Sequence, residues 1–419
     1  MTTSPTTDVP AGDTSAGGDR RGRTTVAALA ITQTIGYGTL YYAFAVLLTP
    51  LTADLNTSTT AVTGAFTVSI LASAALAVPI GRWLDHHGGR ALMTAGSAAG
   101  ALLLLLFSHI DQLWQLYAVQ VGIGVACAAS LYEAAFAVVI ALTSPERRAN
   151  SLLAVTIVAG FSSTVFLPLT GWLANAHGWR TTLLVLAALQ AVTVPLHALL
   201  VRRPVRRTRS RRTTAADNAA VQAALTDPGF WLLALGFTAH TAAISALTVH
   251  LIAALVSWGH QPAFAATVAG LLGVLSVAGR LLATGLQRRH RTTTVTAAVF
   301  AVQAAAALLL PVVGATTGGA IGAVIGFGLG FGVATIAKPV ILAERYDANR
   351  YATLAGILVV PMTLAKAASP LAAAALQAAT GSYIPVLAAA ATCCAVAAAA
   401  IAAVIYHPAA SGNRTRTSP

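Results

Sequence analysis

Charged side chains are scarce in this chain. Asp, Glu, Lys and Arg make up only 9% of its 419 residues, whereas 57% of the residues are hydrophobic. A soluble domain carries about 25% charged residues, and a chain of this length with so few charges could not keep a water-facing surface soluble. The shortage excludes an ordinary soluble protein and indicates a membrane protein in contact with the lipid bilayer.

The net charge of +13 would suggest nucleic-acid binding in a soluble protein. Here the arginines stand in short gaps between apolar runs, and the densest gap, RRPVRRTRSRRTT from Arg202 to Thr214, holds seven of them. Basic segments beside membrane spans typically contact anionic lipid headgroups. We therefore expect no nucleic-acid partner.

Cysteine is rare, and the short motifs of enzymes are missing. Cys127, Cys393 and Cys394 lie inside apolar runs without the spacing of a zinc site or a disulfide framework. No phosphate-binding glycine motif with lysine, GxSxG or HExxH occurs. His86 and His87 are adjacent, so they do not form a metal-binding pair one helical turn apart. The sequence predicts no enzyme, no cofactor and no metal site.

Long apolar runs are what the chain has in abundance. A helix needs about 20 apolar residues to cross a bilayer, and this rule predicts an all-α membrane protein with twelve transmembrane helices. The runs cover residues 25–50, 60–80, 91–109, 113–140, 150–174, 181–201, 229–256, 263–285, 293–313, 319–343, 351–377 and 384–406.

Arginines cluster in every second gap between the apolar runs, and this alternation predicts how the chain is oriented in the membrane. Every second gap is basic, whereas the remaining gaps hold only Arg180. Because basic loops stay on the cytoplasmic side, we expect both termini in the cytoplasm and a multi-pass protein of the plasma membrane, the inner membrane of a bacterium. The expected domains are a disordered cytoplasmic tail 1–23, a six-helix bundle 24–201, a basic cytoplasmic linker 202–227, a second six-helix bundle 228–406 and a cytoplasmic tail 407–419.

The two halves resemble each other. Several residues recur in the same order after 198 or 202 positions: Gly38 and Gly81 match Gly236 and Gly279, and Arg148, Leu152 and Pro168 match Arg350, Leu354 and Pro370. Two parallel repeats with a site between them near the membrane midplane are typical of secondary transporters.

The segment GRWLDHHGGR between the second and third runs resembles the loop motif of the major facilitator superfamily, Gly-x-x-x-Asp-x-x-Gly-x-Arg/Lys. Gly81, Asp85, Gly88 and Arg90 meet this motif, and the resemblance covers about 25–406. It implies a conformational role. Asp85 is expected to accept hydrogen bonds from a helix N-terminus or an arginine of the other half and so to hold the cytoplasmic side shut. The second copy has Ala283 at the aspartate position, which implies an asymmetric latch.

The first run, GYGTLYYAFAVLLTPL, is similar to helix 1 of the monocarboxylate transporter and oxalate–formate antiporter group, although Tyr41 stands where the animal monocarboxylate transporters have a lysine. This resemblance implies a transporter that moves a small organic anion, such as a carboxylate, by alternating access with proton coupling. We expect a monomer.

Ionisable residues at bilayer depth are functional candidates by default. The chain has only two lysines, and both lie in spans. Lys366 is a candidate for substrate binding or proton coupling, with a structural ion pair as the alternative. Arg280 is either a substrate-binding arginine or a snorkelling remnant of the loop motif. The two residues resemble the helix-8 arginine and helix-11 lysine of the oxalate–formate group.

Five further residues in spans are candidates. Tyr37 and Tyr41 share one helical face and either line the substrate path or pack as aromatics. Glu133 carries a coupling proton or pairs with Lys338 or Arg280 as a gate, and Lys338 lies near the inner end of its span, where snorkelling is the main alternative. His240 is a substrate-binding or proton-relay candidate, against a hydrogen-bonded packing role.

Two other classes of protein stay open. A proton-driven exporter of drugs or toxic metabolites is favoured by PLTG from Pro168 to Gly171, a fragment of the antiporter motif. A membrane sensor or scaffold that transports nothing is the third class, although neither the tail nor the linker holds a recognisable signalling domain.

Overall fold

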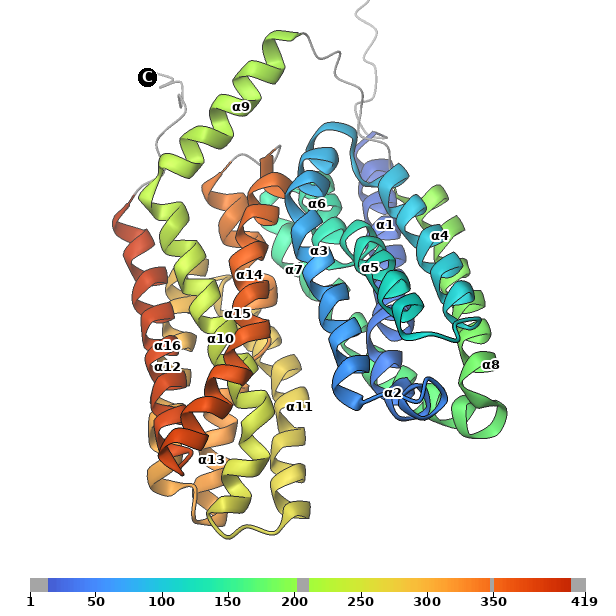
Figure 1. Ribbon diagram of the computed structural model, residues 1–419. Coiled ribbons are helices and arrows are strands. Elements are labelled where there is room, and N and C mark those ends of the chain that lie inside the picture. The colour runs from blue at the N-terminus through green and yellow to red at the C-terminus, as the bar shows by residue number, and fades with distance from the viewer. Residues whose placement is uncertain (1–13, 202–210, 347–349, 408–419) are drawn as a thin grey trace, which may run out of the picture.

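The structure is a computed structural model that describes residues 14–201, 211–346 and 350–407, and within these ranges it is built of helices alone (Figure 1). The helices form two bundles that stand side by side. The first bundle comprises α1 (Thr14–Tyr37), the π-helix η1 (Gly38–Tyr42), α2 (Ala43–Asp54), α3 (Thr59–His87), α4 (Gly89–Phe107), α5 (Leu113–Ser130), α6 (Tyr132–Leu142), α7 (Pro145–Gly160) and α8 (Ser162–Leu200).

The second bundle follows a helix, α9 (Arg211–Thr226), that projects from one end of the molecule (Figure 1). It comprises α10 (Pro228–Ser257), α11 (Pro262–Leu286), α12 (Thr292–Val313), α13 (Thr317–Gly328), α14 (Val333–Arg345), α15 (Tyr351–Thr380), α16 (Ile384–Ala403) and the short η3 (Val404–Tyr406). We call the bundles the N-bundle and the C-bundle.

Twelve spans account for these helices. Eleven stretches of the described chain are long and apolar enough to cross a membrane, and one of them, Pro145–Leu200, has 56 residues. Gly178 divides this stretch, because its φ of 77° and ψ of 163° are not helical. Glycine adopts such a positive φ without the clash that a Cβ would cause. The predicted twelve-helix fold is thus confirmed.

Two helical segments fall within the ranges that the composition assigned to the N-terminal tail and the linker. α1 begins at Thr14, so the helix extends into the range that the composition assigned to a disordered tail. Once an apolar span has nucleated a helix, adding residues at its end costs little. α9 occupies much of the expected linker. Residues 1–13, 202–210 and 408–419 lie outside the described residues.

One end of both bundles carries the loop arginines, and we call it the basic end; among its residues are Arg82, Arg90, Arg147, Arg288 and Arg345. At this end Asp227, just before α10, is joined to Arg345 at 2.9 Å and accepts a hydrogen bond from Tyr346 at 2.7 Å. Burial raises the pKa of Asp227, but hydrogen bonds from Tyr346, the Gly229 N–H and Arg345 more than offset it and lower the pKa. The pair is therefore ionised at neutral pH and is lost only as the pH falls through this lowered pKa.

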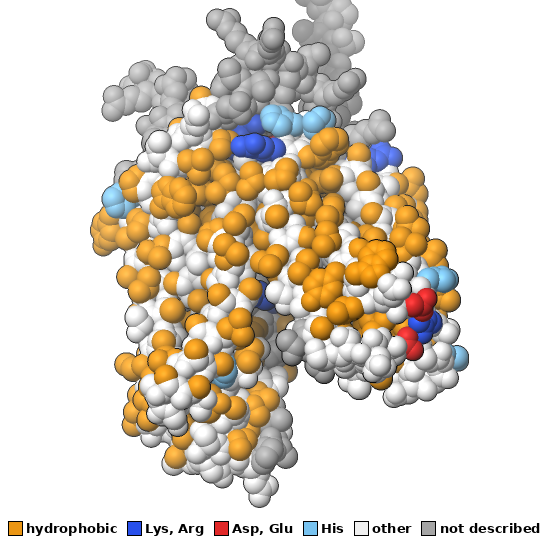
Figure 2. Space-filling model, in the orientation of Figure 1, with side chains coloured by type: hydrophobic (Ala, Val, Ile, Leu, Met, Phe, Trp, Pro, Cys, Tyr) orange, Lys and Arg blue, Asp and Glu red, His pale blue; other side chains and the backbone are white. Residues whose placement is uncertain are grey.

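The two bundles approach each other most closely where α3 packs against α15. A Cβ on Gly81 would overlap the Ala352 carbonyl, and a Cβ on Gly356 would overlap the Ala77 carbonyl. Both glycines lie a few residues from the basic end of their helices. The absence of side chains there lets the two backbones meet and closes the basic end, whereas Figure 2 shows a gap between the bundles at the opposite end.

Gly356→Val places a branched side chain in this contact. We expect it to force α3 and α15 apart at a cost of about 1–3 kcal/mol, as is typical of overpacking, and to favour a state with an open basic end. The measurement is maleimide labelling of Leu84→Cys, a position buried at this interface, in a chain without its native cysteines. Labelling from the basic side should rise about ten-fold, the population change that 1.4 kcal/mol produces.

Gly273→Val is the matched control, because nothing lies within 4 Å of a Cβ at that position. It should leave the labelling of Leu84→Cys unchanged. Unaltered labelling in a folded Gly356→Val protein would show that this contact does not hold the basic end closed.

Candidate functional site between the two bundles

The first span changes its helical geometry at its tyrosines. α1 gives way to the π-helix η1 at Gly38, and the helix resumes as α2 at Ala43. Single π turns inside α-helices often occur at functional sites. Gly38 permits the distortion, because the ring of Phe166 occupies the place of a Cβ there. The spacing along a regular helix places Tyr37 and Tyr41 on one face. The wider turn of η1 brings Tyr42 to the same aromatic group.

The tyrosines of the first span belong to an aromatic cluster in the N-bundle. Tyr41 makes edge contacts with Tyr37, Tyr42 and Phe66 at ring-centroid distances of 6.1, 5.3 and 5.1 Å. Tyr132 at the start of α6 lies 4.5 Å from Tyr37. We call these five residues the aromatic cluster. All of them are partly exposed.

Lys366 brings the C-bundle to this cluster. It lies in the middle of α15, its Nζ donates to the Tyr41 hydroxyl at 3.2 Å, and the same nitrogen lies 5.4 Å from the centre of the Tyr41 ring. Ser245 of α10 donates to the Lys366 carbonyl at 2.8 Å and fixes the backbone there. The side chain of Lys366 is exposed, so it is open to a solute that enters between the bundles.

Arg280 reaches the N-bundle from α11. Its Nη1 donates to the Thr156 carbonyl of α7 at 2.9 Å, and its Nη2 donates to the Ser276 hydroxyl at 3.2 Å. Its Nε is buried and has no acceptor among the described residues. Tyr42 is within electrostatic range of both Arg280 and Lys366, which links the two cations through the aromatic cluster.

Neither cation has an acidic partner in the described part of the chain. Lys366 and Arg280 bind a hydroxyl and a carbonyl, not a carboxylate. At about 1.5 Å per helical residue, Arg280 lies roughly 9 Å and Lys366 roughly 22 Å from the basic-end termini of their helices. The space between the bundles thus carries positive charge at two depths, with Lys366 nearer the open end.

Glu133 and Lys338 form an ion pair between the bundles. Their atoms Oε1 and Nζ are 2.6 Å apart, and the side chains are 33% and 8% exposed. Lys338 therefore points into the protein and does not snorkel to the membrane surface, because its charge finds a carboxylate there. The second oxygen of Glu133, Oε2, is buried without a partner among the described residues. Glu133 and Lys338 thus lie together between the bundles. We call this region, with Lys366, Arg280 and the aromatic cluster, the junction.

Two broken helices position this ion pair. The fourth span is interrupted at Leu131, whose ψ of −158° is extended, so Glu133 lies in the first turn of α6. The tenth span is interrupted between Gly328 and Val333, just before the helix that carries Lys338. Interruptions at corresponding positions of two repeats mark the binding region of many transporters. The second break could have been predicted from the glycines of GFGLGFG, Gly326 to Gly332.

Asp85 lies at the N-terminus of α15. Its carboxylate accepts hydrogen bonds from the backbone N–H groups of Ala352 at 3.0 Å and Thr353 at 2.8 Å. These N–H groups have no partner within their own helix, and the positive end of the helix dipole attracts the carboxylate. Arg350 is also within electrostatic range of Asp85. Gly88, with φ 73°, makes the turn that leads to Arg90 in α4.

His240 lies apart from this junction. It is buried inside the C-bundle, its Nε2 is 2.9 Å from Oε1 of Gln303, and its ring stacks on Phe300 at 4.0 Å. This environment matches the packing alternative and leaves no open face toward a solute.

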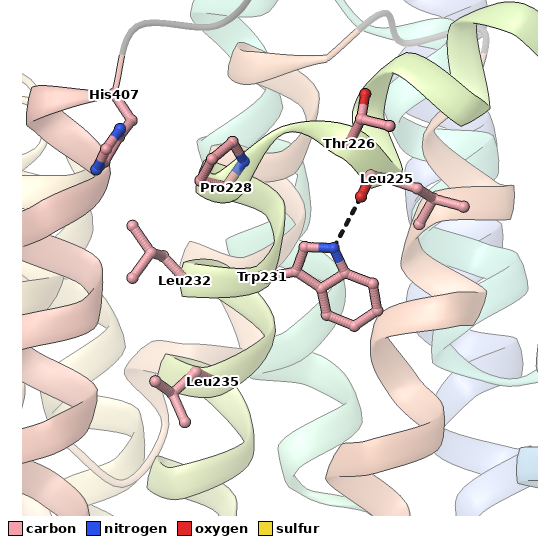
Figure 3. A pocket seen from close by; sticks show the side chains of 7 residues that line it. All are labelled: Leu225, Thr226, Pro228, Trp231, Leu232, Leu235 and His407. Atoms are coloured by element: carbon pink, nitrogen blue, oxygen red, sulfur yellow. Dashed lines mark hydrogen bonds between the residues drawn. The ribbon is translucent and has the colours of Figure 1, made fainter.

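An apolar groove at the basic end is also separate from the junction. It lies where α9 meets α10 (Figure 3) and is lined by Leu225, Pro228, Trp231, Leu232, Leu235 and His407. Trp231 donates to the Leu225 carbonyl at 2.8 Å and is 55% exposed. Tryptophan is enriched at the membrane–water interface, so the groove has the composition of a lipid-facing surface.

The sequence model described as Major Facilitator Superfamily matches residues 29–370. The chain belongs to this superfamily. The match runs through both bundles and includes every residue of the junction. The superfamily and the fold are those of membrane transporters.

Two known proteins are similar over part of the chain. An MFS-type efflux pump of Mycolicibacterium smegmatis is 30% identical over 186 residues, 44% of this chain and 43% of the pump. Monocarboxylate transporter 13 of Rattus norvegicus is 31% identical over 224 residues, 51% of this chain and 50% of the transporter. The chain thus spans about half the length of these relatives.

Solved superfamily structures share the fold along nearly the whole chain. The E. coli fucose:proton symporter FucP superposes with a TM-score of 0.71 at 15% identity, covering 91% of this chain and 97% of that one. The human organic anion transporter MFSD10 gives a TM-score of 0.66 at 14% identity, covering 93% and 99%. At such low identity these structures support the superfamily fold alone.

Asp85→Asn tests the contact that Asp85 of the loop motif makes with the N-terminus of α15. The amide keeps one acceptor but loses the charge, and a carboxylate at a helix N-terminus contributes about 0.3–2 kcal/mol. We expect the initial rate of solute uptake into proteoliposomes to fall about ten-fold, while the affinity for the solute stays within about two-fold. Lost affinity with a normal rate would contradict a conformational role for Asp85.

Proposed function

We propose that the protein is a secondary active transporter that moves a small organic anion, such as a carboxylate, by alternating access with proton coupling. The observation that carries this proposal is the pair of cations, Lys366 and Arg280, that face the junction without a carboxylate partner among the described residues.

Three cations at membrane depth, Lys338, Lys366 and Arg280, differ in their partners. A charged side chain at the centre of a membrane costs about 2.5–3.5 kcal/mol on insertion scales, so an opposite charge nearby is strongly favoured. Lys338 has such a partner in Glu133. Lys366 and Arg280 donate only to neutral oxygens, and the Nε–H of Arg280 donates to none in the described chain. A bound carboxylate supplies the missing negative charge and accepts these donors.

The name of one similar protein supports this class of solute. The relative that is 31% identical over half of this chain is a monocarboxylate transporter.

Lys366→Ala and Arg280→Ala test the anion site. Since a hydrogen bond to a charged group contributes about 1.5–3 kcal/mol, each variant should weaken carboxylate binding about 10- to 150-fold. The measurement is the ligand-induced shift in melting temperature of the purified protein, followed by uptake of the best ligand into proteoliposomes. Arg288→Ala, an exposed arginine after α11, is the control and should bind as the wild type does. Unchanged binding and uptake in both cavity variants would refute the anion site.

Proton coupling is assigned to the Glu133–Lys338 pair. The pair bridges the bundles while the basic end is closed, so opening that end must separate the two charges. Protonation of Glu133 removes the cost of leaving a carboxylate unpaired at that depth. Protonation and opening of the basic end are then linked at the side chain of Glu133.

Glu133→Gln fixes the neutral state of this side chain. We expect loss of solute accumulation driven by a pH gradient in proteoliposomes, whereas exchange of labelled for unlabelled solute at equal pH persists. Glu146→Gln is the control, because Glu146 is an exposed carboxylate at the start of α7. Full pH-driven accumulation in Glu133→Gln would exclude Glu133 as the coupling residue.

Efflux of drugs or toxic metabolites is the second candidate function. It is favoured by the name of the mycobacterial relative, an efflux pump, and by PLTG at Pro168–Gly171 in α8. Resistance profiling of an expressing strain separates the two functions, because a carboxylate transporter should not raise resistance to cationic or neutral drugs.

A further inference from the structure

We propose, on the basis of the anion transport proposed above, that the solute carries an aromatic ring beside its carboxylate. The aromatic cluster and Lys366 together form a site for an aromatic carboxylate: the lysine takes the charged end, and the tyrosines take the ring.

The aromatic cluster differs from the aromatic residues of the hydrophobic core. The large core phenylalanines, such as Phe230, Phe300 and Phe327, are at most 2% exposed. The five members of the cluster, Tyr37, Tyr41, Tyr42, Phe66 and Tyr132, all keep an exposed portion. The chain has nine tyrosines, and four of them are in this one group. Packing of the protein interior alone does not require partly exposed rings gathered at one place.

The distances around Lys366 place the aromatic ring of the proposed solute beside Tyr41. A carboxylate that accepts from Lys366 Nζ lies at about 2.8 Å from it, and the Tyr41 ring centre is 5.4 Å from the same nitrogen. A ring attached to that carboxylate is therefore held next to Tyr41 and Tyr42. These two tyrosines meet edge to face at 88°, the kind of arrangement that aromatic pairs prefer, and a ring of the solute can add a further contact of this kind.

The polar atoms of the cluster suit an anion with a planar body. The Tyr41 hydroxyl accepts from Lys366 in this structure, and in a complex it is free to turn its hydrogen toward the solute carboxylate. Tyr42 is in electrostatic range of Lys366 and Arg280. The π-helix η1 sets both tyrosines, so one local distortion of the first span builds the ring-binding wall.

Benzoate and cyclohexanecarboxylate are the probes that test this proposal. They have the same charge and the same carbon count, but only benzoate has an aromatic ring. The affinity of each is measured by thermal shift and by competition with solute uptake into proteoliposomes. Since aromatic pairs add a modest energy beyond burial, wild-type protein should bind benzoate about 2- to 12-fold more tightly than cyclohexanecarboxylate.

Variants of the cluster show where the preference arises. Tyr41→Leu and Tyr42→Leu should bring the ratio of the two affinities close to one, whereas Tyr41→Phe should retain the ratio. Tyr406→Leu is the control, because Tyr406 is 83% exposed at the basic end, and it should leave the ratio unchanged.

The possible outcomes separate this proposal from the anion function. Equal wild-type affinities for the two probes, both weakened by Lys366→Ala, would overturn the aromatic proposal and leave the anion function standing. A wild-type preference that persists in both Tyr→Leu variants would also overturn it. If neither probe binds wild-type protein, the aromatic proposal fails, and the anion function is then decided by the Lys366→Ala and Arg280→Ala experiments described above.

Discussion

A charge inside the membrane needs a partner, and in this protein the partners lie across the boundary between the two bundles. Glu133 of the N-bundle meets Lys338 of the C-bundle, and Asp85 meets the N-terminus of α15. Each contact removes the cost of an isolated charge in this structure, in which the basic end is closed. A state in which the bundles separate at that end would need another way to compensate these charges. Lys366 and Arg280 have no carboxylate partner in the described chain, and in the proposed function an anionic solute neutralises them.

Close backbone packing makes these contacts possible. Gly81 and Gly356 let α3 and α15 approach until the Asp85 carboxylate reaches the first N–H groups of α15. The second copy of the loop motif has Ala283 in place of the aspartate, and that residue is buried in the core. The closing contact at the basic end is thus asymmetric between the repeats. In the proposed function, a proton on Glu133 and a carboxylate near Lys366 would act on the same boundary between the bundles, which would provide a physical route to coupling.

Hydropathy and arginine placement predicted the twelve spans, because apolar length and loop charge are local properties of the sequence. The loop motif likewise indicated a helix N-terminus or an arginine as the partner of Asp85. Three features were out of reach. The π-helix at Gly38–Tyr42 depends on Phe166 packing against Gly38. A packing role for His240 was one of the alternatives, but its partners Gln303 and Phe300 could not be predicted. The Asp227–Arg345–Tyr346 group depends on helix ends that are distant in sequence. Such contacts arise from tertiary packing, which a single sequence does not display.

The most direct test of the account is an experimental structure of the purified protein with a bound carboxylate ligand. The account predicts that a carboxylate oxygen lies about 2.7–2.9 Å from Lys366 Nζ, between the bundles and beside Tyr41. A carboxylate bound at a site that neither Lys366 nor Arg280 reaches would contradict it.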